Sequence, residues 1–229
     1  MAERYTWITL SEYQGRLIDV MNKVEQEKLN SIKKIVLFPI MKPEHESTTK
    51  SGHAILYMLK ALKPLLIKYK DIEFLEIETF DQVRDEKFLI KDNELMFLLD
   101  DYLGSGETIK TSIEEILKNR NIDIYKINVI SIAAQNESIV FLNDIGISIY
   151  TDFVSNKGIS DYYISEDLDE KIEIMKEIEK LIPGNHFNFG YNGSEALITL
   201  MRTPDNTFPI FWKEHKKNNK EFEAPFSRY

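Results

Sequence analysis

The sequence predicts an α/β fold in which helices flank a mainly parallel central sheet and a small hood lobe follows at the C-terminus. Short apolar runs alternate with amphipathic helical patterns at least four times, which is typical of βαβ units and a parallel sheet. Residues 185–229 break this alternation, because they are aromatic, rich in turns and short-stranded. We therefore expect an N-terminal helical segment (residues 1–32), an α/β core (residues 33–184) and a C-terminal hood and tail (residues 185–229).

The composition limits the classes of protein to which the chain can belong. A chain of 229 residues with 43% hydrophobic residues can bury one full core. Its net charge of −9 argues against broad affinity for nucleic acid, and its lack of cysteine excludes disulfides and thiolate zinc sites. The four histidines show no metal-ligand spacing, and no apolar run approaches the roughly 18 residues of a membrane span. The first residues lack the pattern of a secretory signal, so we expect a cytoplasmic protein without a membrane partner.

The first third of the chain contains two expected helices and one strand. A capping-box pattern in SEYQ (residues 11–14), followed by apolar residues at helical spacing, predicts a helix that ends near residue 30. The apolar run KKIVLFPI (residues 33–40) predicts a strand that is covered on both faces. After a polar loop, a second helix is expected from Ser51 or Gly52, with a kink or break at Pro64.

The remaining elements repeat the alternation of strand and helix. IEFLEIETF (residues 72–80) alternates apolar and acidic residues, as a strand near the edge of a sheet does. The other expected strands are apolar runs, and the other expected helices are amphipathic. In chain order they are a buried strand at 94–101, a helix at 108–119, a strand at 127–134, a helix at 136–144, a strand at 147–154 and a helix at 166–182 that Pro183 and Gly184 end.

The stretch MFLLDDYLGSGET (residues 96–108) carries the main candidate site. In an open parallel sheet, ligands bind beyond the carboxyl ends of the strands, where this stretch places two acids and a small-residue turn. The turn and the start of the next helix predict a cradle for one phosphate group, whereas Asp100 and Asp101 suit neutral hydroxyls or a divalent cation beside it. The alternative is an ordinary strand-to-helix turn in which the aspartates are caps. The predicted phosphate-binding residues are Gly104, Ser105, Gly106, Glu107 and Thr108.

This stretch resembles the ribose-5-phosphate-binding motif of type I phosphoribosyltransferases, in which an apolar run precedes two acids, a spacer and a Ser/Thr-Gly-x-Thr loop. The resemblance implies that Asp100 and Asp101 are the catalytic pair and contact the ribose hydroxyls of phosphoribosyl pyrophosphate (PRPP). It also implies that the loop holds the 5-phosphate, with Glu107 at the variable position serving through its backbone N–H while its carboxylate points away. Mg²⁺ is the implied cofactor, bound through PRPP, with Asp100 and Asp101 as candidate ligands.

The resemblance implies a second loop, after the first core strand, that holds pyrophosphate. Here that loop ends in TTKSG, so Lys50 can pair with the anion while Ser51 and Gly52 offer donors at the start of a helix. The alternative is that Ser51 only caps the helix and Lys50 is solvated.

Residues 71–93 fall where many members of this family place a flexible catalytic loop. Arg84, Lys87 and Lys91 are candidates to neutralise the departing pyrophosphate. The alternative is a solvated, charged loop without a catalytic role.

The C-terminal segment carries a more particular resemblance. KSG, DDYLGSGET and RTPDNTFPIFW (residues 202–212) together resemble a phosphoribosyltransferase-like family of bacterial conflict and anti-phage systems, over residues 33–212. Some members of that family are retron-associated, which implies companion proteins such as a reverse transcriptase or a DNA-binding subunit. The aromatic residues of this segment either stack a base or form core. They are Phe208, Phe211 and Trp212, together with Pro209.

Three functions follow from these resemblances. The first is a PRPP-dependent phosphoribosyltransferase-like effector of anti-phage defence that acts at C1 of ribose on an unknown acceptor. The second is a non-catalytic subunit that senses a phosphoribosyl compound or nucleotide. The third is a nucleobase salvage phosphoribosyltransferase.

Overall fold

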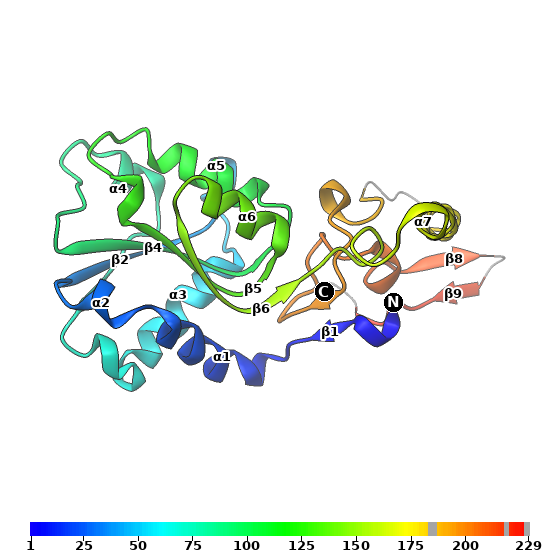
Figure 1. Ribbon diagram of the computed structural model, residues 1–229, viewed down its shortest axis with the longest axis horizontal. Coiled ribbons are helices and arrows are strands. Elements are labelled where there is room, and N and C mark those ends of the chain that lie inside the picture. Colours follow the sequence, from blue (N-terminus) through cyan, green and yellow to red (C-terminus); the bar gives the residue numbers. More distant parts are fainter. Residues whose placement is uncertain (183–186, 218–219, 227–229) are drawn as a thin grey trace. The chain divides into compact units, whose positions relative to one another are not determined.

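The computed structural model describes residues 1–182, 187–217 and 220–226, and the chain divides into two compact units (Figure 1). Residues 12–154 form one unit, and residues 1–11 together with 155–229 form the other. Residues 12–32 belong to the same unit as the following α/β elements, and the chain passes into the other unit at residue 155. The expected three segments stay a prediction.

A five-stranded sheet organises the unit of residues 12–154. Its strand order is β3-β2-β4-β5-β6, and the pairs β2–β3, β2–β4 and β4–β5 are parallel. The predicted α/β fold with a mainly parallel sheet is therefore confirmed. The expected acidic edge strand is also confirmed, since β3 is short and lies at the end of the strand order. The strands are β2 (Lys34–Pro39), β3 (Glu73–Glu76), β4 (Glu94–Leu103), β5 (Ile127–Gln135) and β6 (Ser148–Ser155).

Helices cover both faces of this sheet, with α1, α2 and α3 on one face and α4, α5 and α6 on the other (Figure 1). The expected first helix is two helices here, because α1 ends at Lys23 and α2 follows separately. Helix α3 ends before Pro64, as predicted. The helices are α1 (Leu10–Lys23), α2 (Gln26–Leu29), α3 (Ser51–Leu62), α4 (Phe80–Arg84), α5 (Glu107–Ile116) and α6 (Asn136–Asp144).

The main core fills the space between the sheet and helices α4, α5 and α6. Alternate residues of three neighbouring strands point into it, and the side chains of these helices complete it. Burying one such aliphatic side chain contributes roughly 1.5–3 kcal/mol, so this layer fixes the position of α5 on the sheet. Its members include Val36, Phe38, Met96, Leu98, Ile127, Val129, Ile109, Ile113 and Leu142.

The second unit contains α7 (Ser165–Glu179) and several short strands. Strand β1 (Thr6–Trp7) pairs in parallel with β7 (Ile198–Thr199), and β8 (His215–Lys217) pairs antiparallel with β9 (Lys220–Phe222). Pro183 and Gly184, which we expected to end α7, lie outside the described residues. None of the helices in the described ranges has the length and apolar character that a membrane crossing requires.

The aromatic segment near the C-terminus contributes to the core of this second unit. Phe208 is completely buried in a cluster with residues such as Met175 of α7. Phe211 packs against Tyr5 at 4.5 Å between ring centroids, and the Trp212 indole N–H donates to the Thr207 carbonyl at 2.7 Å. For Phe208 and Phe211 the structure therefore favours the core alternative over a base-stacking wall.

The carboxyl end of the sheet contains a step between neighbouring strands. The pairing of β2 with β4 ends at Pro39 and Leu99, whereas β4 continues beside β5 as far as Leu103. Asp100, the first of the two acids, is therefore the first residue of β4 beyond the pairing with β2. At this step the start of α3 packs against the strand ends, where Gly52 lies next to Leu99 and Ile40.

Candidate functional site

The Asp100 side chain is held at the step by the start of α3. Ser51, the first residue of α3, donates its hydroxyl to Asp100 Oδ1 at 2.5 Å. The Asp101 backbone N–H donates to the same oxygen at 2.9 Å. The Ser51 hydroxyl thus bonds a carboxyl group of the site. In the alternative reading this hydroxyl would only cap its own helix.

Asp101 is held from the N-terminal helix instead. The Tyr13 hydroxyl of α1 donates to Asp101 Oδ2 at 2.9 Å, and Tyr13 is completely buried. Asp100 and Asp101 are only 9% and 7% exposed, so both carboxyl groups sit within the sheet end rather than in bulk solvent. The sequence alone did not indicate a role for Tyr13, because the helical spacing of apolar residues in α1 makes it only one of several residues that face the sheet.

Both carboxyl groups have raised pKa values. Burial raises the pKa of Asp100 well above its usual range, and the charge of Asp101 raises it further, against the hydrogen bond from Ser51. Burial also raises the pKa of Asp101, against the hydrogen bonds from Tyr13 and Ser51. Two adjacent buried acids therefore favour holding a proton between them, and a bound cation would favour the ionised forms.

A buried hydroxyl lies next to this acidic pair. Ser131 of β5 is the register partner of Asp100, and it is completely buried. Within the described residues its Oγ has no hydrogen-bond partner. Residues in register on parallel strands face the same side of the sheet, so Ser131 adds a polar group beside Asp100 that a ligand could satisfy.

The loop from Gly104 to Thr108 leads directly from β4 into α5. Gly106 has a φ of 80°, a left-handed conformation that glycine adopts at little cost, and α5 begins at the next residue. The N–H groups of the first turn of a helix lack partners within the helix, and the helix dipole favours an anion there. The predicted phosphate cradle is therefore a half-buried loop at a helix start, one residue past the end of β4.

An ion pair connects this loop to the segment after β2. The Lys42 Nζ lies 2.9 Å from Glu107 Oε1. The Glu107 carboxylate is thus directed toward a lysine beside the predicted phosphate site. Sequence reasoning did not select Lys42, which stands before a proline in an unremarkable polar loop.

The predicted pyrophosphate loop packs tightly against the two central strands. A Cβ atom on Gly52 would lie 2.5 Å from the Leu99 carbonyl oxygen and 2.9 Å from the Ile40 nitrogen. Gly52 therefore allows α3 to start directly on the strand ends that carry the acids. The Lys50 N–H donates to His53 Nδ1 at 3.1 Å, and the peptide bonds of the described residues are all trans.

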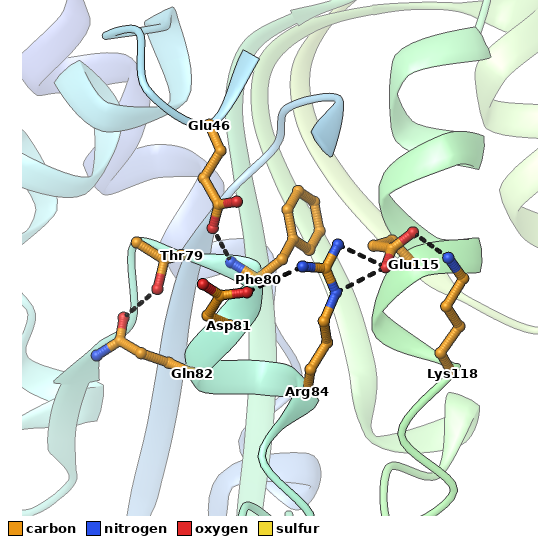
Figure 2. A network of polar contacts seen from close by, with 8 residues as sticks. All are labelled: Glu46, Thr79, Phe80, Asp81, Gln82, Arg84, Glu115 and Lys118. Carbon is orange, nitrogen blue, oxygen red and sulfur yellow. Dashed lines mark hydrogen bonds and ion pairs between the residues drawn. The ribbon is translucent and has the colours of Figure 1, made fainter. Parts of the chain in front are cut away.

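Arg84 lies in an ordered ion-pair network on α4 (Figure 2). Its Nε and Nη2 approach Glu115 Oε1 of α5 at 2.8 and 2.7 Å, and its Nη1 lies 3.0 Å from Asp81. Burial alone would raise the pKa of Glu115, but the hydrogen bonds from Lys118 and Arg84 outweigh it and lower that pKa. The structure thus places the guanidinium between two helices.

The other two basic candidates of this region are exposed. The backbone N–H of Lys87 donates to Asp85 and that of Lys91 donates to Glu94. The role of Arg84, Lys87 and Lys91 at a departing pyrophosphate stays a prediction.

Among the described residues, no group of three or more His, Asp or Glu side chains could hold a metal ion alone. The donors at the site are two carboxyl groups, and Mg²⁺ commonly binds to one or two carboxylates while substrate phosphates and waters complete its coordination. The two carboxyl groups therefore fit Mg²⁺ whose remaining ligands come from phosphate groups and waters.

The fold and this strand–loop–helix arrangement define a phosphoribosyltransferase-like α/β protein. The model of the PRTase-CE family matches residues 7–228, so the chain belongs to the PRTase-CE family. Comparison with curated proteins finds no significant match.

Several solved structures are similar to the chain at low sequence identity. Orotate phosphoribosyltransferase from Aeropyrum pernix is 16% identical, with 63% of this chain and 71% of that chain covered and a TM-score of 0.37. Purine phosphoribosyltransferase from Pyrococcus horikoshii is 15% identical, with 66% and 85% covered and a TM-score of 0.37. A hypothetical protein from Neisseria gonorrhoeae with bound ppGpp is 14% identical, with 76% and 97% covered and a TM-score of 0.43.

Proposed function

We propose that this chain binds PRPP and acts as a phosphoribosyltransferase-like enzyme, with Asp100 and Asp101 as its catalytic pair. The observation that carries the proposal is the placement of two buried, adjacent acids one short spacer before a glycine loop and a helix start. In this proposal the loop at 104–108 binds the 5-phosphate and the acids bind the ribose hydroxyls.

The polar character of the acids supports binding of a diol. Burial raises the pKa of both carboxyl groups, and the charge of Asp101 raises that of Asp100 further, so the pair offers groups that can both accept from and donate to hydroxyls. A phosphate would not share their position, because its negative charge would meet two acids. The phosphate and the ribose thus have separate places along one segment of chain.

In this proposal Asp100 and Asp101 supply the protein's ligands for Mg²⁺ that enters with PRPP. When bound, the ion neutralises charge on pyrophosphate as that group leaves C1. The protein's own contribution is to hold the ring by its hydroxyls and its 5-phosphate, so that an acceptor meets C1 in line through an oxocarbenium-like state. Pyrophosphate then leaves near Lys50 and the start of α3.

We propose further that this activity serves a bacterial anti-phage defence system. The resemblance of KSG, DDYLGSGET and RTPDNTFPIFW to the conflict-system family supports this role. The acceptor is then a nucleotide, a nucleic acid or a protein, and companions such as a reverse transcriptase or a DNA-binding subunit are the expected partners. A companion of that kind would supply the nucleic-acid affinity that a net charge of −9 disfavours.

A second candidate is a sensor that binds a phosphoribosyl compound without turnover. The observation that favours it is that both acids already accept hydrogen bonds from the protein's own hydroxyls, those of Ser51 and Tyr13. Acids held in this way can recognise a diol through their remaining acceptor sites and still lack catalysis.

Calorimetric titration with PRPP and Mg²⁺ tests the proposal. The variant with both Asp100→Asn and Asp101→Asn should lose PRPP binding, while it keeps acceptor oxygens for Ser51 and Tyr13 and so keeps its fold. Unchanged affinity in this variant would refute the assignment of the acids. Release of pyrophosphate from PRPP in the presence of bases, nucleotides or RNA separates the enzyme from the sensor.

The gene neighbourhood separates defence from the remaining alternative, nucleobase salvage. A reverse transcriptase or DNA-binding protein encoded beside this chain supports the defence role. A metabolic operon would contradict it and favour salvage.

A further inference from the structure

Tyr13 stands out among the groups that surround the acidic pair. It lies on α1, far from β4 in sequence, and its ring is completely buried. Tyr13, Leu17, Val20 and Met21 are the buried residues of this helix, and their spacing presents one face to the sheet. Of these four side chains, only Tyr13 carries a polar group, and its hydroxyl lies 2.9 Å from Asp101 Oδ2.

The chemistry of a phenol suits a supporting role toward an acid. A buried carboxyl group loses its hydration, and a donor compensates part of that cost. A lysine or arginine in this position would cancel the negative charge, whereas the neutral phenol fixes one oxygen and leaves the charge available to a ligand. The rigid ring, packed within a helix face, also limits rotation of the carboxyl group.

We infer that Tyr13 is a positioning residue for ribose recognition: it holds Asp101 through Oδ2 so that Oδ1 meets a ribose hydroxyl. This inference rests on the proposed function. If Tyr13 has this role, α1 contributes to a site whose motif, residues 96–108, lies far away in the sequence. Asp100 is held in the same manner by Ser51, so each acid is fixed by a hydroxyl from a different helix.

The matched control is a second buried tyrosine that also meets α1. Tyr69 is completely buried, and its hydroxyl donates to the Met21 carbonyl of α1 at 2.7 Å. Tyr69→Phe therefore removes a buried tyrosine hydroxyl that bonds α1 but does not touch the acids. Comparison of Tyr13→Phe with Tyr69→Phe separates a general loss of stability from a specific loss of ribose positioning.

Each variant is titrated with Mg²⁺-PRPP and, separately, with Mg²⁺-pyrophosphate, which lacks the ribose. Tyr13→Phe should weaken PRPP binding about tenfold, as expected for the loss of a hydrogen bond to a carboxyl group, and should weaken pyrophosphate binding clearly less, because pyrophosphate has no ribose hydroxyl for Asp101 to meet. Tyr69→Phe should change neither. Equal affinities of Tyr13→Phe and wild type for PRPP, or equal weakening for both ligands, would overturn the inference.

Two further results keep this test decisive. If the wild-type chain itself fails to bind PRPP, the proposed function falls, and the inference falls with it. If Tyr13→Phe does not fold, 3-fluorotyrosine placed at position 13 of the otherwise unchanged protein provides a fluorine NMR signal. That signal should shift more on addition of Mg²⁺-PRPP than of Mg²⁺-pyrophosphate, while the same label at position 69 stays unmoved. An unmoved signal at position 13, or equal shifts with both ligands, contradicts the inference.

Discussion

The Lys42 ammonium group lies 2.9 Å from Glu107 Oε1, so the segment after β2 and the first residue of α5 are joined by an ion pair. The Lys42 side chain is 18% exposed and that of Glu107 is 39% exposed. The Glu107 carboxylate therefore forms an ion pair with Lys42 directly beside the loop that we propose binds a phosphate. A bound phosphate would compete with Glu107 for this lysine.

Substitutions of the pair should change phosphate affinity in opposite directions. Glu107→Gln removes a negative charge and releases Lys42, so the affinity for Mg²⁺-PRPP should rise by about two- to fivefold. Lys42→Ala should lower it about tenfold. Calorimetry measures both, with Lys60→Ala as the control, because Lys60 forms an exposed pair with Glu76 at 2.9 Å. A decrease in affinity for Glu107→Gln would show that its carboxylate supports the site.

Gly52→Ala should destabilise the sheet unit. The new methyl group would meet backbone atoms at 2.5 and 2.9 Å, which cannot move without shifting α3 or the strands. The free energy of unfolding should fall by about 1–3 kcal/mol in urea denaturation. Gly15→Ala is the control, since nothing lies within 4 Å of its Cβ position in α1. It should raise stability by roughly 0.5–1 kcal/mol, and equal effects of the two changes would contradict the packing argument.

Arg84→Ala distinguishes a structural role from a catalytic one. Loss of the guanidinium leaves Glu115, which is 7% exposed, with Lys118 as its remaining cation, so stability should fall by about 1–3 kcal/mol. Affinity for Mg²⁺-pyrophosphate should stay at the wild-type value. Lys87→Ala, on an exposed residue of the same region, is the control and should leave the stability unchanged. Weaker pyrophosphate binding in Arg84→Ala would instead support the flexible-loop assignment.

Glu179 should make the stability of the second unit depend on pH. It is 3% exposed, and burial raises its pKa to about 7, against the hydrogen bonds from the Phe189 N–H. Since the folded chain holds this proton more tightly than the unfolded chain does, stability is greatest below about pH 4.5. It should decline as the pH rises to about 7, by up to about 3 kcal/mol.

Thermal unfolding between pH 5 and pH 8 measures this decline. Glu179→Gln keeps an acceptor for Phe189 and removes the ionisation, so its melting temperature should vary less with pH than that of the wild type. A wild-type curve parallel to that of the variant would contradict the assignment to Glu179.

The sequence predicted the five strands of the sheet well, because apolar runs and helical spacing report burial on a layered sheet directly, but it did not predict α4 in the charged stretch between β3 and β4. It missed the break between α1 and α2, where no proline or glycine interrupts the pattern. It also did not predict that β1 pairs with β7. The pairing of β1 with β7 joins residues far apart in sequence, and no local pattern encodes such a contact.

At the site, the motif predicted the acids and the loop, and Asp100, Asp101 and Ser51 do lie together. The supporting residues could not be predicted in the same way. Tyr13 and Lys42 reach the site through tertiary packing, and each looks locally like an ordinary helix or loop residue. For Arg84 the sequence suggested a contact with pyrophosphate, because the residue is charged. Its partner in the structure is Glu115, which lies 31 positions further along the chain and could not be recognised from a local pattern.

The pairing of β1 with β7 also bears on how the chain is synthesised. Residues 12–154 are continuous, so this unit can fold while the ribosome is still producing the C-terminal residues. Thr6 and Trp7 of β1, in contrast, cannot pair until Ile198 and Thr199 of β7 have left the ribosome. Thr6 and Trp7 are therefore synthesised before residues 12–154 but acquire their neighbouring strand only after that unit is complete.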